Sequence, residues 1–196
     1  MTTNRTATVT RKTNETDIHL SLNIDGTGSS RLETGLGFFD HMLACLAKHA
    51  RFDLELTCKG DLEIDEHHSL EDIGIVFGTA LGQAIGDKAG ISRFAHALVP
   101  LDEALSRVVV DVSGRGFLSF NADFSRDNVG EMSTEMVEEF WWAVATKAGV
   151  TIHMEVLCGK NSHHQVESLF KAAARALYEA TRLTGFEDVP STKGVL

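Results

Sequence analysis

The chain has 196 residues, of which 43% are hydrophobic and 23% charged, as is ordinary for a globular protein with ample core. Its formal net charge of −10 argues against a general nucleic-acid binder, which needs a basic face. No apolar run approaches the length of a membrane span, and the N-terminal stretch lacks the pattern of a signal peptide. Three dispersed cysteines indicate reduced thiols, so we expect a cytoplasmic protein. The charge and the lack of a long apolar run lead us to expect no nucleic-acid and no membrane partner.

The first half of the chain alternates strand and helix patterns. Apolar and polar residues alternate over residues 17–24 and again over 52–58, which predicts two half-buried strands. Between them, residues 37–49 have a helical apolar face, and His41, Cys45 and His49 form a stripe on much of the opposite side. Such a stripe is often only the polar edge of a helix.

Residues 67–85 predict a second helix, which completes the first half. The second half repeats the alternation, because residues 93–123 predict more sheet and residues 131–147 a third helix with Gly149 as its C-terminal cap. A strand pattern over 150–156 precedes a last helix that ends near Gly185.

Chemistry-bearing residues recur at similar spacing in the two halves, which indicates an internal duplication. We expect an α+β fold, an internally duplicated module with two four-stranded sheets and four helices packed as a layer between them. Residues 1–92 would form the first half and residues 93–196 the second, within one compact unit. The aligned pairs are His67, His68 and Glu71 with His163, His164 and Glu167 (offset 96), Glu15 with Glu103 (offset 88), and His41 with Glu139 (offset 98).

The repeated motif is His-His-x-x-Glu at the start of a helix. Residues three or four apart share a helix face, so each glutamate lies beside both histidines of its motif. Adjacent histidines point about 100° apart, which suits them to two different ions or faces. Imidazoles and carboxylates suit manganese, iron or zinc, and His41 or Glu139 from the preceding helix would add a ligand in each half. A single copy would be no more than a polar helix start, but the repetition indicates a functional site.

Two ions, each bound by about three nitrogens and one carboxylate, would leave open positions for a substrate. A few clustered basic residues could hold an anionic group, although singly such residues are usually only on the surface. The basic candidates are Arg93, Arg115, Lys171, Arg175 and Lys193, and the acid–base candidates are Glu15, Asp102 and Glu103.

Two alternatives fit the same ligands. A dinuclear metallohydrolase would need a bridging water between two close ions, which the distance between the metals would reveal. A non-catalytic metal-storage or shell protein would explain histidine-rich repeats, but it gives no reason for the basic residues, and a phosphate titration would test it.

Together with the two histidine motifs, four further segments resemble the imidazoleglycerol-phosphate dehydratase family, in the same order over essentially the whole chain. The resemblance implies a manganese-dependent lyase of histidine biosynthesis that converts imidazole glycerol phosphate to imidazole acetol phosphate, with two Mn(II) ions per active site. It also implies an assembly of 24 copies with active sites between subunits. The segments are Gly37-Phe-Phe-Asp-His-Met42, Pro100-Leu-Asp-Glu-Ala104, Gly149-Val-Thr-Ile-His153 and Pro190-Ser-Thr-Lys-Gly194.

The resemblance also implies roles for individual residues. One departure is Glu139, at a ligand position that can be histidine in the family; a carboxylate can still bind manganese there. The implied metal ligands are His41, His67, His68, Glu71, Glu139, His163, His164 and Glu167. The implied substrate-binding residues are Glu15, His41, His49, Arg93, Arg115, His163, Lys171, Ser191 and Lys193, and the catalytic residues are Glu15, His49, Glu71 and Glu167.

Overall fold

Alternating sequence gives each sheet one buried face and one outward face. In strand β2 (Thr16–Asn23), Leu20 and Leu22 are buried while His19 and Ser21 are exposed. The computed structural model describes residues 5–196; residues 1–4, which belong to the stretch that lacks a signal-peptide pattern, lie outside the described residues.

The element order is the same in the two halves, apart from one small hairpin in the second. The first half contains β1 (Thr6–Lys12), β2, β3 (Ser30–Glu33), α1 (Gly37–Ala50), β4 (Asp53–Gly60) and α2 (His67–Ile85). The second half contains β5 (Phe94–Leu101), β6 (Ala104–Asp111), β7 (Phe117–Asn121), β8 (Asn128–Val129), β9 (Met132–Ser133), α3 (Met136–Ala148), β10 (Thr151–Cys158) and α4 (Ser162–Thr181).

The two large sheets have equivalent strand orders, β1-β2-β4-β3 and β5-β6-β10-β7. In each sheet the last strand of the half pairs antiparallel with the second strand and parallel with the third. This equivalence confirms the expected α+β fold with two four-stranded sheets, while the boundary at residues 92 and 93 stays a prediction.

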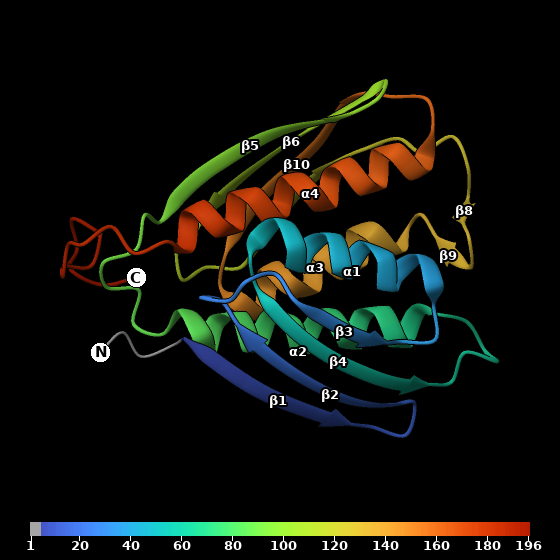
Figure 1. Cartoon of the computed structure of the whole chain (residues 1–196), viewed down its shortest axis with the longest axis horizontal. Helices are drawn as coiled ribbons and strands as arrows, with labels where there is room; N and C mark the ends of the chain where they lie inside the picture. The colour runs from blue at the N-terminus through green and yellow to red at the C-terminus, as the bar shows by residue number, and fades with distance from the viewer. Residues whose placement is uncertain (1–4) are drawn as a thin grey trace.

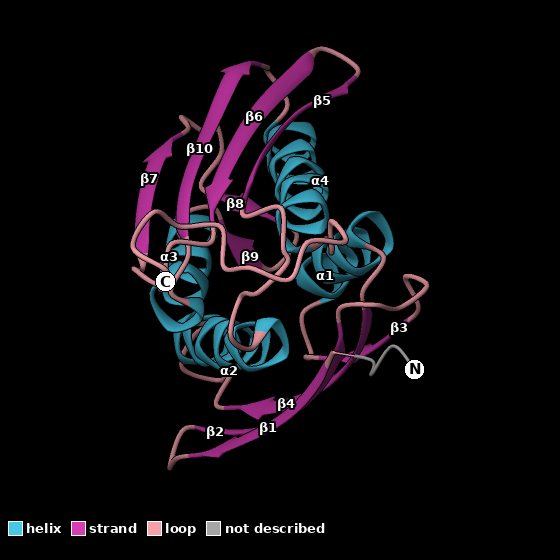
Figure 2. Ribbon diagram, turned by 90° about the vertical axis from the view of Figure 1, so that its left-hand side faces the viewer, coloured by secondary structure: helices cyan, strands magenta, loops and turns pink. Residues whose placement is uncertain are grey.

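The helices form a layer between the sheets (Figure 2). Helix α2 packs against β1 and β2, α4 packs against β5 and β6, and the helices also meet in the pairs α2–α3 and α1–α4. Aromatic side chains fill the centre, with Phe140 stacked on Phe170 and edge-on to Phe39. No helix within residues 5–196 is both long and apolar enough to cross a membrane.

Two predicted boundaries of helices differ in the structure. The third helix begins at Met136 rather than near residue 131, because the preceding residues form the β8–β9 hairpin, in which Gly130 adopts a positive φ of 61°. The last helix ends at Thr181, before Gly185, and the chain then forms a bridge from Leu183 to Ile91. Gly149 caps α3 in the left-handed conformation, as predicted.

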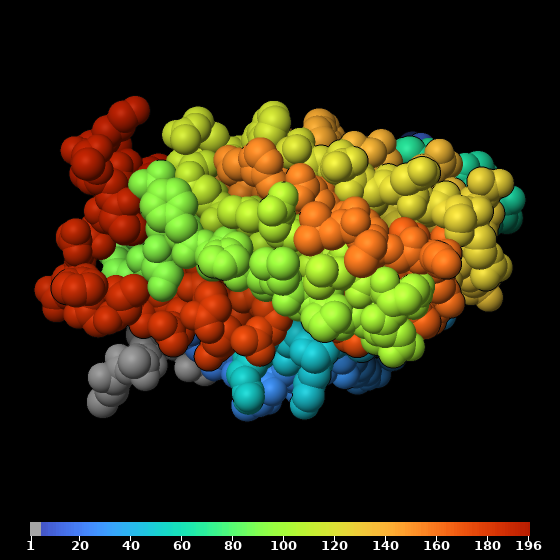
Figure 3. Space-filling view, turned by 90° about the horizontal axis from the view of Figure 1, so that it is seen from above, coloured from blue at the N-terminus to red at the C-terminus, as the bar shows by residue number. Residues whose placement is uncertain are grey.

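All four helices begin at the same end of the molecule (Figure 1). The histidine motifs open α2 and α4, so both lie at this end. The C-terminal segment projects at the opposite end, where Figure 3 shows it in red beside the outer face of the second sheet.

Candidate metal and active site

Each histidine motif begins its helix with the same backbone contact. The backbone N–H of His67 donates to Asp65 Oδ1, and that of His163 donates to Asn161 Oδ1, both at 2.9 Å. Side-chain oxygens satisfy the free N–H groups of a first helical turn in this way. The local geometry that presents the two histidine pairs is therefore duplicated along with the motif.

Helices α1 and α4 bring one carboxylate together with three basic side chains. Nε2 of His41 lies 3.2 Å from Glu167 Oε2, and Nε2 of His163 lies 3.1 Å from the same oxygen. Lys171 Nζ lies 2.6 Å from Glu167 Oε1, and Cys45 Sγ lies 4.0 Å from that oxygen. We call these five residues the α4 cluster.

Glu167 is ionised well below neutral pH. Its side chain is only 12% exposed, and burial alone would raise its pKa. Hydrogen bonds from Lys171, His41 and His163, with the charge of Lys171, instead lower the pKa to about 2. The cluster thus holds a carboxylate in the form that a metal ion requires. Burial, followed by the charge of Glu167, raises the pKa of the Cys45 thiol.

His164 points to a different carboxylate from its neighbour His163. Its Nδ1 lies 2.8 Å from Glu103 Oε2, which raises the pKa of the imidazole. The contact with His164 and the backbone N–H groups of Asn161 and Lys160 lower the pKa of Glu103 to about 2. A carboxylate on Nδ1 orients an imidazole so that Nε2 can bind a metal.

The first half contains a related pairing around His68. Asp61 lies 3.1 Å from Nδ1 of His68 and raises the pKa of the ring, while Glu15 lies 3.7 Å from Nε2. Glu15 and Glu103 are equivalent in the duplication, so both halves set a carboxylate from a strand–strand turn beside the second histidine of the motif.

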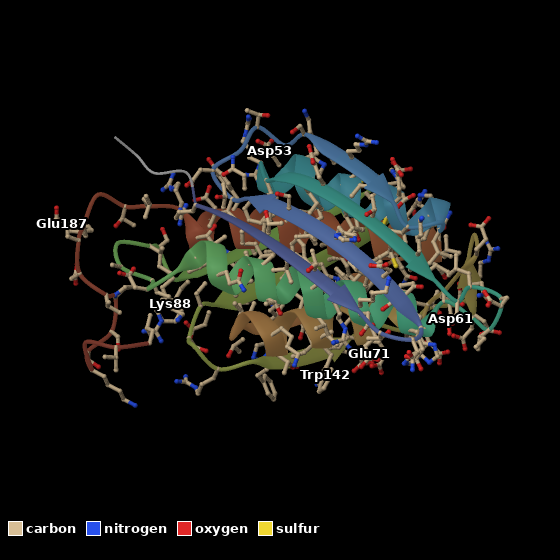
Figure 4. All side chains as sticks on the ribbon, turned by 90° about the horizontal axis from the view of Figure 1, so that it is seen from below. Asp53, Asp61, Glu71, Lys88, Trp142 and Glu187 are labelled. Carbon is tan, nitrogen blue, oxygen red and sulfur yellow. The ribbon has the colours of Figure 1, made fainter. Side chains whose placement is uncertain are left out.

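The other predicted ligands do not converge within one chain. His67 is exposed, and Glu71 and Glu139 are partly buried on helices α2 and α3. Within residues 5–196, no hydrogen bond or ion pair connects Glu71 or Glu139 to another side chain. Figure 4 shows Glu71 on the same side of the molecule as Asp61, away from Lys88 and Glu187.

A pocket of about 370 Å³ adjoins the α4 cluster. His49, Lys171 and Arg175 line it together with residues of β5. Burial, with the positive charges of Lys171 and Arg175, lowers the pKa of His49, so its imidazole is neutral at pH 7.

The remaining predicted basic residues line a larger pocket of about 850 Å³ beside the C-terminal segment. It contains Arg93, Arg115, Ser191 and Lys193. The Arg93 side chain pairs with Asp111 at 2.8 Å and donates to the Pro190 carbonyl at 2.7 Å. Its guanidinium is therefore oriented by contacts with the protein.

The histidine motif on α4 and the pocket of basic residues lie far apart in one chain. The backbone N–H of Arg93 donates to Ala180 O at the end of α4, whereas His163 stands at the start of that helix. At about 1.5 Å per residue, these positions are separated by about 25 Å. A small substrate cannot contact both regions of the same copy.

Sequence reasoning missed two contributors to the site. Asp61 belongs to no motif, and its contact with His68 depends on the path of the loop before α2. Cys45 belongs to the polar stripe of its helix, but nothing local indicates that Glu167, 122 residues further on, lies beside it. The sequence does name Glu103 as an acid–base candidate, and the duplication pairs it with Glu15.

The donor set fits a divalent transition metal. The α4 cluster offers two imidazole nitrogens and an ionised carboxylate, which suit manganese, iron or zinc. His68 and His164 each carry a carboxylate contact on Nδ1, as metal-bound imidazoles usually do.

Comparison with known proteins gives the family. The family model for imidazoleglycerol-phosphate dehydratase matches residues 34–177. Relatives with that name include one from Gluconacetobacter diazotrophicus, 58% identical over 100% of both chains, and one from Clostridium botulinum, 50% identical over 98% of this chain and 99% of the relative.

Solved structures agree with this result. The imidazoleglycerol-phosphate dehydratase of Staphylococcus aureus has a TM-score of 0.83 and 41% identity, over 91% of this chain and 99% of that one. The Pyrococcus furiosus enzyme has a TM-score of 0.83 and 36% identity, over 96% of this chain and 100% of that one. The chain therefore belongs to the imidazoleglycerol-phosphate dehydratase family.

Proposed function

We propose that this protein removes water from imidazole glycerol phosphate to give imidazole acetol phosphate, with two Mn(II) ions per active site. Its family makes it a hydro-lyase of histidine biosynthesis. The observation that carries the finer proposal is the α4 cluster, in which His41 and His163 converge on Glu167 from two helices.

The metal ligands proposed are those implied by the family. Bound ions would supply Lewis-acid chemistry to the substrate ring and to the leaving hydroxyl group. The histidine motifs project from rigid helices, and carboxylates on Nδ1 fix the rings of His68 and His164. The ligands are His41, His67, His68, Glu71, Glu139, His163, His164 and Glu167.

The proposed catalytic residues have two roles: Glu15 and His49 would move protons, and Glu71 and Glu167 would keep the metal ligands in place. Glu15 is exposed and lies 3.7 Å from Nε2 of His68, so it can reach a substrate ring held there. His49 is neutral at pH 7 and can accept a proton. Glu71 and Glu167, one turn into α2 and α4, would hold the ligand geometry while protons move.

Basic side chains would bind the phosphate. Arg93 and Arg115 offer guanidinium groups that match phosphate oxygens, and Ser191 and Lys193 lie in the same pocket. Lys171 lies in the pocket next to the α4 cluster, where it can contact the substrate from the metal side.

A complete site then needs more than one copy of the chain. The basic pocket lies about 25 Å from the histidine motif on α4, so the basic residues of one copy would serve the metal end of another. This separation supports active sites between subunits, and the proposed number of 24 copies is the one that the family implies. We place the enzyme in the cytoplasm, where the thiols of Cys45, Cys58 and Cys158 stay reduced.

The proposal is tested by assaying dehydration of imidazole glycerol phosphate after chelation, with and without added manganese. Turnover should be absent in metal-free buffer and return with manganese. Replacing Glu71 or Glu167 by glutamine should lower turnover by about a thousandfold or more and weaken metal binding. The control Glu55→Gln, on the outer face of β4, should leave both unchanged. Full activity in metal-free buffer would refute the proposal.

A further inference from the structure

Cys45 is the member of the α4 cluster for which the proposed function gives no role. It follows His41 by four residues, so both side chains lie on the same face of α1. Ligand atoms of His41, Cys45 and Glu167 all lie within 4.8 Å of one another. Three potential metal donors from two helices thus surround one point.

The position of the thiol is not explained by core packing. The neighbouring apolar residues Met42, Leu43 and Leu46 are fully buried, whereas Cys45 is only partly buried and faces a carboxylate. A thiol that only filled space would be expected among those apolar side chains. Cys45 instead lies 4.0 Å from Glu167 Oε1.

We propose that Cys45 is a metal ligand that gives the α4 cluster a high affinity for thiophilic divalent cations such as zinc and cadmium. The cation would be held by His41, Cys45, Glu167 and His163, a set of two nitrogens, one sulfur and one oxygen. Soft thiolates select such ions, whereas manganese prefers oxygen and nitrogen ligands. The inference shares His41, His163 and Glu167 with the proposed manganese site, but it requires neither manganese nor turnover.

Binding is a simple exchange of a cation for a proton. The Cys45 thiol loses its proton to solvent as the metal–sulfur bond forms, and no electron is transferred. Lys171 must also leave, because its ammonium group now lies 2.6 Å from Glu167 Oε1. Its flexible four-carbon side chain can turn toward the adjacent pocket, which it also lines.

The first test is X-ray absorption on the chelated full-length protein loaded with one zinc ion per chain. We expect a sulfur ligand at about 2.3 Å in addition to nitrogen and oxygen ligands at about 2.0–2.1 Å. The Cys158→Ser variant, which removes an exposed thiol elsewhere, should keep the sulfur shell, and Cys45→Ser should lose it. A wild-type spectrum with only nitrogen and oxygen ligands would overturn the inference without use of any variant.

The second test compares affinities by competition with a chelating dye. Cys45→Ser should weaken cadmium binding by about tenfold or more and change manganese binding by less than about threefold. Equal losses for both ions would contradict a soft-metal role. The outcome is separable from the proposed function, because a missing sulfur shell would leave manganese-dependent dehydration intact, and missing dehydration would leave the zinc spectrum unchanged.

Discussion

Glu167 is the residue on which the α4 cluster depends. It accepts contacts from His41, His163 and Lys171, and they hold its pKa near 2 although the side chain is largely buried. An ordinary glutamate has a pKa of 4.5. Because folding lowers this pKa, Glu167 stabilises the fold above about pH 4.5, and the contribution is lost as the pH falls toward 2.

The metal-free Glu167→Gln variant should therefore be less stable than the wild-type protein at pH 7. The difference in stability between the two should shrink as the pH falls from about 4.5 to 2. The urea concentration at the midpoint of unfolding, measured across this range, gives the comparison. Glu55→Gln on the exposed face of β4 provides the control, with a curve parallel to that of wild type. A stability difference between wild type and Glu167→Gln that does not change with pH would show that the contacts do not lower the pKa.

At this scale the sequence predicted the residue types better than their partners. Fixed helical spacing places Glu167 beside His163 and Lys171, and these two contacts are local. The contact of His41 with Glu167 joins residues 126 apart, and the resemblance to a family, rather than any periodicity, placed both residues in one site. The convergence of Glu71 and Glu139 on a metal stays a prediction.

At the scale of elements, close packing of helices α2 and α3 depends on small residues. A Cβ added at Gly78 would lie 2.7 Å from Val144 O and 3.0 Å from Lys147 Cβ, so the backbones would have to separate. A Cβ added at Gly82, one turn further along α2, would lie 3.5 Å from Ala148, which is an ordinary contact.

These distances predict opposite effects of the same substitution. Gly78→Ala should destabilise the protein by about 1–3 kcal/mol through overpacking, despite the better helix propensity of alanine. Gly82→Ala should stabilise it by up to about 1 kcal/mol, because it gains propensity without a clash. Urea denaturation of both variants provides the measurement, and equal signs would contradict the packing shown.

Most elements could be predicted because their patterns are long and regular. The alternation over residues 17–24 appears as β2, and the apolar faces of residues 37–49 and 67–85 appear as α1 and α2. The β8–β9 hairpin was not predicted, since two-residue strands have no periodicity to detect. The four-residue strand β3 was also not predicted, because its parallel pairing with β4, rather than its local sequence, defines it.

At the scale of the whole molecule, the duplication was predictable because the histidine motifs recur at one offset. The two sheets have equivalent strand orders, as a duplicated module requires. The separation of the histidine motifs from the basic pocket was not predictable, since it depends on all four helices starting at one end (Figure 1).

This separation predicts complementation between two inactive variants. Glu167→Gln damages the metal end, and Arg115→Ala damages the basic end. In mixed assemblies made by co-expression, about a quarter of the sites would combine two intact ends, and activity should return to about that level. A mixture of Glu167→Gln with His163→Gln, both at the metal end, should stay inactive. Failure of the first mixture to regain activity would show that each site lies within one chain.

The most direct test of the central claim is anomalous diffraction from crystals grown with manganese. Two anomalous peaks should appear at each active site, within coordinating distance of the histidine pairs that open α2 and α4. Crystals that diffract well but show no manganese beside either pair would contradict the account.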